Sequence, residues 1–331
     1  MQHALVTGAP GFLGAHIVQA LVQRGVRVRG WGRPGEPCDH LRPLAKGSEL
    51  EMIEGDVRDP ALARRAVEGI DTVFHAAAVY ESWAPDPTLM YDVNMRGTFN
   101  VLCAAREVGA RVVYTASVVA LGRPAPGVLA DEDTPYEAWD LDFPYSRSKY
   151  HSMRLAEDFA AWGLDVRIVC PGYVMGPGDR TPTPSGQLLI ALAQGKAPGY
   201  TAGGIAYVDV RDAALGHVSA AERGRPGRRY VVSGHNIDNA MLIRIVARAA
   251  GRRPIAIPLP KPVARGAAAV LQRAAVARGR RPDLATVMLE YGMRECFYDN
   301  RRAREELGLR FRPFEDTVAD GLTWFREAGM L

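Results

Sequence analysis

Lysine is scarce in this chain of 331 residues, although basic residues as a class are not. Only four of the 41 basic side chains are lysines, at positions 46, 149, 196 and 261, so each of them is informative. Cysteine is equally rare, and its four copies are scattered without a C-x-x-C spacing at Cys38, Cys103, Cys170 and Cys296. This pattern predicts reduced thiols in a cytoplasmic protein, and no metal site is expected.

The sequence also has no long apolar run and no low-complexity tracts. Its first residues, MQHALVTGAPG, run directly into a predicted strand, so no signal peptide is expected. The most apolar late stretch, ARGAAAVLQRAAVARGRR, is interrupted by arginines and predicts a packed helix, not a membrane span. The net charge is only +4, and the basic run at 278–282 has no interleaved aromatics. We therefore expect neither a nucleic-acid partner nor a membrane partner.

Short β-rich runs alternate with helical stretches through the first half of the chain. Strands are predicted at 3–8, 26–31, 50–56, 71–78, 110–117 and 164–172, with another at 228–234. Helices are predicted after the first strand, at 60–68, at 88–109 and around Tyr145. This alternation predicts an α/β fold with a doubly wound, Rossmann-type parallel sheet.

Beyond residue 172 the regular alternation of strands and helices no longer continues. GPGDRTPTPSGQ (176–187) reads as a loop, and the region beyond 238 is mainly helical. We predict a dinucleotide-binding core at 1–172, completed by about 205–237. A smaller, mainly helical substrate-binding lobe would then be built from 173–204 and 238–331.

A glycine-rich turn follows the first predicted strand. VTGAPGFLGAH places Gly8, Gly11 and Gly14 between that strand and its helix. Glycine there allows a tight turn, close approach of a pyrophosphate and close helix–sheet packing. An ordinary strand–helix turn is the alternative, but the position in the first βα unit favours dinucleotide binding.

The end of the second strand bears on the choice of dinucleotide. Arg33 follows Gly32, and no acid stands at the strand end to bind a ribose 2′-hydroxyl. A guanidinium can bind a 2′-phosphate, so NADPH is favoured and NAD remains possible. The alternative is that Arg33 is one surface arginine among many. Asp56, at the end of the third strand, can accept from the adenine amino group, and Val57 can pack on the ring.

Tyr145 and Lys149 are spaced to share one face of a helix that begins with Pro144. A tyrosine with a pKa of about 10 is a reluctant acid or base at neutral pH. A lysine ammonium one turn away is expected to lower that pKa, together with the positive charge of an oxidised nicotinamide. The pair then predicts acid–base chemistry on a carbonyl or alcohol.

With these pieces the chain resembles the extended short-chain dehydrogenase/reductase family. The motifs stand in the family's order: TGAPGFLG (7–14), GDVRD (55–59), HAAA (75–78), VNMRGT (93–98), YTASVVALG (114–122), YSRSK (145–149) and PGYVMGPGD (171–179). Within the family it is most similar to dihydroflavonol-reductase-like proteins and to proteins labelled hopanoid-associated sugar epimerases. The resemblance covers nearly the whole chain.

The resemblance implies roles for individual residues. Ser117, Tyr145 and Lys149 would be catalytic, with Ser117 polarising the carbonyl and Lys149 also binding the nicotinamide ribose. The implied cofactor contacts are Thr7, Gly8, Gly11, Phe12, Leu13, Gly14, Arg33, Asp56, Val57, Ala76, Ala77, Ala78, Asn94, Tyr145, Lys149, Pro171, Gly172 and Val174. Tyr80, Trp83, Ser117 and Tyr173 would contact substrate. For Asn94 a buried structural hydrogen bond is the alternative, and His75 is expected to be packed instead of titrating.

The substrate is expected to be a small-molecule ketone. Nucleotide-sugar enzymes of the family place an arginine before a Y-x-H-V-x-D-like strand, whereas this chain has Ile205 there and Asp209 in place of the histidine. That departure favours NADPH-dependent reduction of a cyclic or aromatic, non-nucleotide ketone, with natural-product tailoring as the expected setting. The alternatives are an NAD(P)-dependent sugar epimerase or dehydratase and a non-catalytic dinucleotide sensor.

The family further implies a homodimer through the helices that follow the fourth and fifth strands. Their apolar residues, such as Leu102, Val108, Met153 and Phe159, would serve equally as monomer core. The identity of the ketone and the direction and stereochemistry of hydride transfer are not encoded in these motifs.

Overall fold

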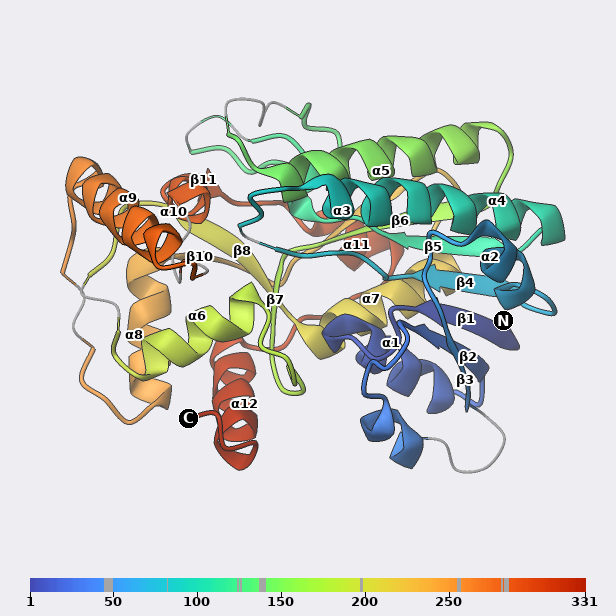
Figure 1. Ribbon diagram of the computed structural model, residues 1–331, viewed down its shortest axis with the longest axis horizontal. Helices are drawn as coiled ribbons and strands as arrows, with labels where there is room; N and C mark the ends of the chain where they lie inside the picture. Colours follow the sequence, from blue (N-terminus) through green and yellow to red (C-terminus); the bar gives the residue numbers. More distant parts are fainter. Residues whose placement is uncertain are drawn as a thin grey trace.

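A seven-stranded parallel sheet organises the molecule (Figure 1). The computed structural model describes residues 1–44, 50–81, 83–123, 125, 127–136, 141–196, 199–254, 257–280, 282 and 286–331. In spatial order the strands are β3 (Leu50–Glu54), β2 (Arg27–Gly32), β1 (His3–Thr7), β4 (Thr72–His75), β5 (Arg111–Thr115), β6 (Val166–Pro171) and β9 (Arg229–Val232). Every neighbouring pair is parallel. The predicted doubly wound α/β fold is therefore confirmed.

The strand order reverses between β1 and β4, and helices cover both faces of the sheet. α1 (Phe12–Val22) and α7 (Val210–Arg223) pack together on one face. α2 (Pro60–Ala66), α4 (Thr98–Val108) and α5 (Pro144–Ala161) lie on the other, along the upper side in Figure 1. In doubly wound sheets ligands bind at the carboxyl ends of the strands beside such a reversal. The fold thus positions a site where β1, β4 and β5 end.

The helix predicted at 88–109 is built from three consecutive parts. α3 (Thr88–Tyr91) runs into a π-helical turn at Asp92–Gly97 and then into α4. The fourth strand ends at His75, so residues 76–78, which were predicted to be strand, form a loop. π-Turns inside helices occur frequently at functional sites. Here the π-turn carries Asn94.

A second sheet lies beside the first, at the left in Figure 1. It is built around β8 (Gly204–Asp209). The strands that pair with β8 are β7 (Tyr173–Met175), β10 (His235–Asp238) and β11 (Glu295–Cys296). Its surrounding helices are α6 (Pro184–Ala193), α8 (Asn239–Ala249), α9 (Lys261–Ala277), α10 (Thr286–Gly292) and α12 (Phe314–Glu327), whereas α11 (Arg301–Glu306) packs against β9 of the main sheet. β8 lies in the range expected to complete the core, yet it pairs in this second sheet. The assignment of this lobe to substrate binding stays a prediction.

The loop expected at 176–187 is shorter than predicted. α6 begins at Pro184, where the Thr183 hydroxyl caps the helix by accepting from the Gly186 N–H (3.3 Å). A threonine followed by proline is a strong start signal for a helix. The remaining loop, 176–183, runs from β7 to α6.

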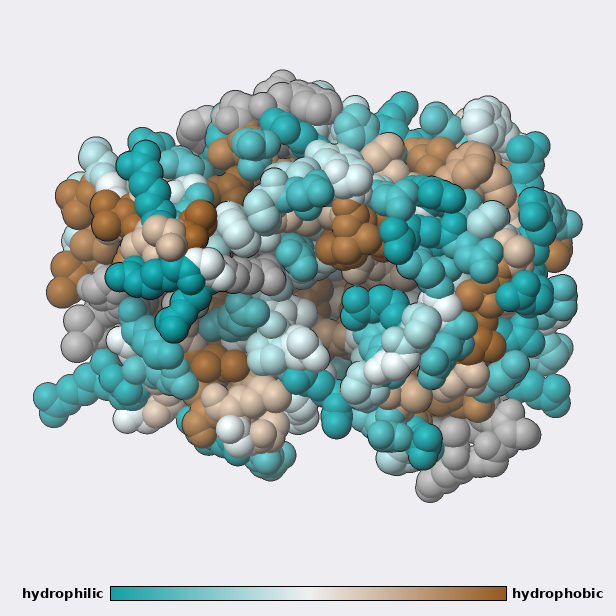
Figure 2. Space-filling view, viewed as in Figure 1, coloured by the Kyte–Doolittle hydropathy of each residue, from teal (hydrophilic) through white to brown (hydrophobic). Residues whose placement is uncertain are grey.

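Each face of the main sheet has its own core, one around Leu102, Met153 and Phe159 and the other around Ile17 and Leu21. The four cysteines are free thiols. Among the described residues, no helix is both long and apolar enough to cross a bilayer. Hydrophobic side chains nevertheless gather on the surface over α9, at the left of Figure 2.

Candidate active site

The glycine turn joins β1 to α1 and lies against the loop that follows β4. Gly8 has a φ of +69°, which residues with a side chain rarely adopt. A Cβ on Gly14 would lie 2.0 Å from the Gly8 carbonyl oxygen, and one on Gly8 would lie 2.9 Å from the Ala77 Cα. α1 begins at Phe12, and the first N–H groups of a helix have no intrahelical partners. This cradle fits a pyrophosphate, as the sequence predicts.

Thr7 and His75 connect the ends of β1 and β4 through hydrogen bonds. The Thr7 hydroxyl accepts from the Ala77 N–H (3.1 Å) and hydrogen-bonds His75 Nδ1 (2.8 Å). His75 Nε2 lies 3.0 Å from the Thr98 hydroxyl, and burial lowers the pKa of the imidazole to about 3. His75 is therefore a packed, neutral residue, as expected. A direct cofactor contact of Thr7 stays a prediction.

Tyr145, Lys149 and Ser117 come together where β5 ends. Pro144 starts α5, so Tyr145 and Lys149 lie in its first turns, and Ser117 follows β5 by two residues. The Ser117 hydroxyl accepts from the Val119 N–H (3.4 Å) and lies close enough to the Tyr145 phenol to lower its pKa. Lys149 Nζ donates to the Thr115 carbonyl oxygen (2.8 Å) and is almost fully buried. The predicted constellation is thus assembled, although its catalytic role remains a prediction.

The electrostatics of this cluster differ from expectation in one respect. Burial raises the pKa of the Tyr145 phenol above its ordinary value, and the nearby Ser117 hydroxyl only partly offsets this. Burial also lowers the pKa of Lys149 to about 8. The expected lowering of the Tyr145 pKa by Lys149 is therefore wrong for the protein's own groups. Both side chains are withdrawn from water, and desolvation is the largest cause of each shift.

Asn94 is fully engaged with the protein. Its amide donates to the Val79 carbonyl (3.1 Å) and to the Ser148 hydroxyl (2.9 Å), and its oxygen accepts from the Val79 N–H (2.8 Å). It therefore ties the loop after β4 to the helix that carries Lys149. This is the buried structural hydrogen bond left open by the sequence, and the predicted cofactor contact has no remaining amide N–H to use.

Tyrosines form a wall beside the Tyr145 phenol. The rings of Tyr80 and Tyr145 have centroids 4.6 Å apart, and Phe143 lies 5.9 Å from Tyr145. The Tyr80 phenol lies close enough to the Tyr173 phenol to affect its pKa, and Tyr207 packs edge-on to Tyr173 (5.7 Å). Two of the three predicted substrate aromatics are thus brought to Tyr145. The third, Trp83, is half-buried on the segment that follows Tyr80.

Three residues of this neighbourhood received no role from the sequence. Phe143 and Tyr207 complete the aromatic wall. Asp179 is buried and accepts from the Thr183 N–H and hydroxyl (2.9 and 2.7 Å), and burial raises the pKa of its carboxyl to about 6. The GPGD motif was the available signal for Asp179. For Phe143 and Tyr207 no local signal existed, because an aromatic residue in a strand or before a helix is ordinary core.

At the end of β2, where the adenosine part of the cofactor is expected, the structure differs from the sequence prediction. The Arg33 side chain is 77% exposed, but its guanidinium is paired with Glu36 (3.3 Å). The same Glu36 accepts from the Arg33 N–H (3.1 Å). A carboxylate therefore does lie at the end of β2, contrary to expectation. The sequence analysis missed it because Glu36 is four residues beyond the end of β2 and the turn folds it back.

Asp56 and Val57 also have protein partners. Asp56 pairs with Arg58 (2.6 Å), whose guanidinium continues to Asp92 (2.9 Å). This hydrogen-bonded pairing holds the pKa of the Asp56 carboxyl below its usual value. Val57 packs against Gly97, where a Cβ would lie 2.6 Å from Val57 Cγ2. Their adenine contacts stay predictions.

The remaining predicted cofactor residues line the strand ends. Pro171 ends β6, and a Cβ on Gly172 would lie 2.7 Å from the Ala206 carbonyl oxygen. Val174 pairs with Val208 in the second sheet. The other members of the set are half-buried, with the exception of exposed Ala78, and occupy the first turn of α1 or the loop after β4: Phe12, Leu13, Ala76, Ala77 and Ala78.

The position where nucleotide-sugar enzymes place an arginine is buried. Ile205 lies in β8 between Ile237 and Cys296. Asp209 caps α7 and pairs with Arg211 (2.6 Å). Among the described residues, no group of three His, Cys, Asp or Glu side chains could hold a metal ion.

A Rossmann sheet with a glycine cradle after β1, and with Ser117, buried Tyr145 and buried Lys149 gathered after β5, defines the class of protein. The molecule is an NAD(P)-dependent oxidoreductase of the short-chain dehydrogenase/reductase type. Residues 4–233 match the NAD dependent epimerase/dehydratase family. The chain belongs to that family.

Known proteins resemble the chain along its whole length. A Synechocystis sp. protein named as a dihydroflavonol 4-reductase is 33% identical over 98% of this chain and 94% of its own. Sterol demethylase protein B of Methylococcus capsulatus is 32% identical over 99% of both chains. The crystal structure of gox2253 superposes with a TM-score of 0.86, at 35% identity over the full length of both chains.

Proposed function

We propose that the protein is a ketoreductase that uses NADPH to reduce a small, non-nucleotide ketone, cyclic or aromatic, to an alcohol in natural-product tailoring. The observation that carries the proposal is the buried Tyr145 phenol at the end of β5, one helical turn from the buried Lys149 and against the Tyr80 ring (4.6 Å). A reduction needs an acid that is protonated before the reaction starts, because the product oxygen must receive a proton. The raised pKa keeps Tyr145 protonated at neutral pH.

The residues of the site divide the chemistry of a reduction between them. NADPH, when bound, supplies the hydride for the carbonyl carbon. The Ser117 hydroxyl donates to the carbonyl oxygen and orients it. Tyr145 gives its proton to that oxygen as negative charge develops, which completes the alcohol. The Lys149 ammonium, one turn along α5, favours the phenolate that is left.

An epimerase or dehydratase would begin by oxidising its substrate, and Tyr145 would have to start as a phenolate. Burial of the phenol opposes that state. An anionic sugar diphosphate would also find Ile205, buried in β8, where a guanidinium is needed. Both observations favour reduction over epimerisation. Because the molecule is an oxidoreductase, we do not propose the alternative of a non-catalytic dinucleotide sensor.

The aromatic wall supports a cyclic or aromatic ketone as substrate. Tyr80, Phe143 and Tyr173 offer flat apolar faces around the acid, and such faces suit ring systems. Two relatives are named for a dihydroflavonol and a sterol, which are both polycyclic. A panel of cyclic ketones tests the proposal when NADPH oxidation is followed at 340 nm. Interconversion of nucleotide sugars without net NADPH consumption would refute it.

The cofactor preference depends on Arg33. A 2′-phosphate would take the place of Glu36 as the partner of the guanidinium. We expect Arg33→Ala to raise the KM for NADPH about tenfold, the effect of losing a charge-assisted contact. The KM for NADH should change less than twofold. Steady-state kinetics with both cofactors measure this.

Arg42→Ala is the matched control, because Arg42 is 79% exposed and also pairs with an acid three residues away, Asp39 (3.3 Å). It should leave both KM values unchanged. Glu36→Gln, which frees Arg33 from its partner, should lower the KM for NADPH. Equal use of NADH and NADPH by the unaltered protein would contradict the preference.

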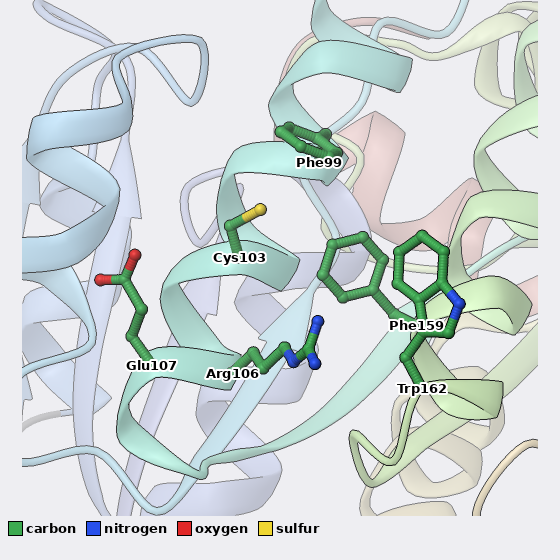
Figure 3. Close-up of a pocket in the computed structure, with 6 residues that line it drawn as sticks. All are labelled: Phe99, Cys103, Arg106, Glu107, Phe159 and Trp162. Carbon is green, nitrogen blue, oxygen red and sulfur yellow. The ribbon is translucent and has the colours of Figure 1, made fainter.

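We also propose a homodimer through α4 and the end of α5. Leu102, Met153 and Phe159 are buried in the monomer, so they belong to its core. Phe99 and Trp162, by contrast, are about half exposed. They line a hollow together with Cys103, Arg106, Glu107 and Phe159 (Figure 3). Large exposed aromatics beside a hollow are typical of protein interfaces.

Trp162→Glu is expected to convert the dimer to a monomer and so to halve the mass measured by sedimentation equilibrium. The substitution removes the aromatic ring from the interface and adds a charge that would have to be desolvated there. Val128→Glu, at an equally exposed residue away from α4 and α5, is the control and should not change the mass. A monomeric unaltered protein would refute the dimer.

A further inference from the structure

The basic residues of this chain are unevenly distributed. Residues 239–282 contain ten of the 41 Lys and Arg side chains and none of the 37 Asp and Glu side chains. The rest of the chain therefore has 31 basic and 37 acidic residues and is net negative. The modest overall charge of +4 conceals one strongly positive segment. This segment includes α8 and α9.

α9 presents an apolar stripe to solvent. Ala264 and Ala268 form its buried side, and the helix packs against α10. Val263, Val270 and Leu271 are 58%, 65% and 61% exposed. Their spacing of seven and eight residues places them on one side of the helix, since two turns comprise about seven residues. Three large aliphatic side chains on one side of α9 are therefore exposed to solvent.

The same region carries further apolar and basic side chains. Ile257, just before α9, and Val276, near its end, are about half exposed. Arg273, Arg278 and Arg280 are exposed around the stripe. Figure 2 shows the result over α9, where brown and teal side chains lie next to one another. Arg265, on the same helix, pairs with Glu290 of α10.

We propose that α9 docks on the surface of an anionic lipid bilayer, with its apolar stripe in the headgroup–acyl boundary and its arginines at the headgroups. A helix with an exposed aliphatic stripe and a basic polar face has the composition of interfacial membrane helices. Basic clusters add attraction to anionic lipid. Nucleic acid would neutralise the arginines but would leave the aliphatic side chains in water, so lipid is the better match. This surface departs from the expectation of no membrane partner.

Contacts connect α9 to the active site. α9 packs on α10, and Tyr291 of α10 lies 6.1 Å from the Phe143 ring. Phe143 in turn contacts Tyr145. A bilayer under α9 would therefore lie on the same side as the aromatic wall, where an apolar substrate could arrive from the lipid phase. The docking itself does not depend on the proposed reduction.

Co-sedimentation with vesicles tests the proposal. The unaltered protein should bind vesicles of phosphatidylcholine and phosphatidylglycerol at least tenfold more tightly than vesicles of phosphatidylcholine alone, and high salt should weaken the binding. The double variant Val270→Glu/Leu271→Glu should lose at least tenfold in affinity. Val128→Glu, which alters an equally exposed aliphatic residue elsewhere, should bind as the unaltered protein does.

Two further measurements keep the outcomes distinct. NADPH affinity and the thermal unfolding midpoint should be the same in both variants, so loss of vesicle binding cannot be ascribed to misfolding. Absence of vesicle binding by the unaltered protein at low salt would overturn the proposal. Retention by duplex DNA without vesicle binding would assign the surface to nucleic acid instead. A fall in sedimentation mass in the double variant, again without vesicle binding, would assign it to a second copy of the chain.

Discussion

Tyr145→Phe is expected to lower kcat for ketone reduction by about 10³-fold, within the 10²–10⁴ range of a lost general acid. The substitution removes one oxygen from a buried ring, so the packing against Tyr80 and Phe143 is retained. The product alkoxide would then have to take its proton from water in a site where the phenol is withdrawn from solvent. NADPH oxidation at 340 nm under saturating ketone measures the loss.

Tyr207→Phe is the matched control for this experiment. Tyr207 is also a buried tyrosine, and it contacts Tyr173 instead of Tyr145. For Tyr207→Phe we expect kcat to change less than threefold. NADPH binding should be unchanged in Tyr207→Phe and in Tyr145→Phe. Turnover of Tyr145→Phe close to that of the unaltered protein would remove Tyr145 from the chemistry and with it the proposed mechanism.

The parts of the site that local sequence could predict are those set by backbone geometry and short spacing. Gly8 and Gly14 are predictable because a tight turn into a helix admits little else, and the structure places a carbonyl where the Gly14 Cβ would be. Tyr145 and Lys149 are predictable because four residues make one helical turn. The parallel pairing of the strands follows from the alternation of strands and helices.

Other features depend on contacts between distant segments, and no local pattern contains them. The π-turn at 92–97 brings Asn94 to Val79 and Ser148, which commits its amide to the protein. Glu36 reaches Arg33 because the chain turns back after β2. The direction of the Tyr145 pKa shift depends on how deeply the tertiary fold buries the phenol. Residue spacing in the sequence predicted which side chains lie together. The burial of those side chains in the fold sets the direction of their pKa shifts.

Lys149 offers the second large effect, and it includes a pH dependence. Burial disfavours the charged ammonium and lowers its pKa to about 8, so the side chain is charged below that pH and neutral above it. If the ammonium stabilises the phenolate of Tyr145, kcat should fall as the pH rises through about 8. Lys149→Met should lower kcat at pH 7 by about 10²-fold, the low end of acid–base contributions.

The pH profile separates this role from a structural one. Lys149 Nζ also holds the Thr115 carbonyl (2.8 Å), so its loss could disturb the end of β5. Lys149→Arg keeps a charge that does not titrate in this range. It should therefore retain more activity than Lys149→Met and should lose the decline near pH 8. A profile that still declines near pH 8 in both variants would assign that titration to another group, because neither variant retains the lysine.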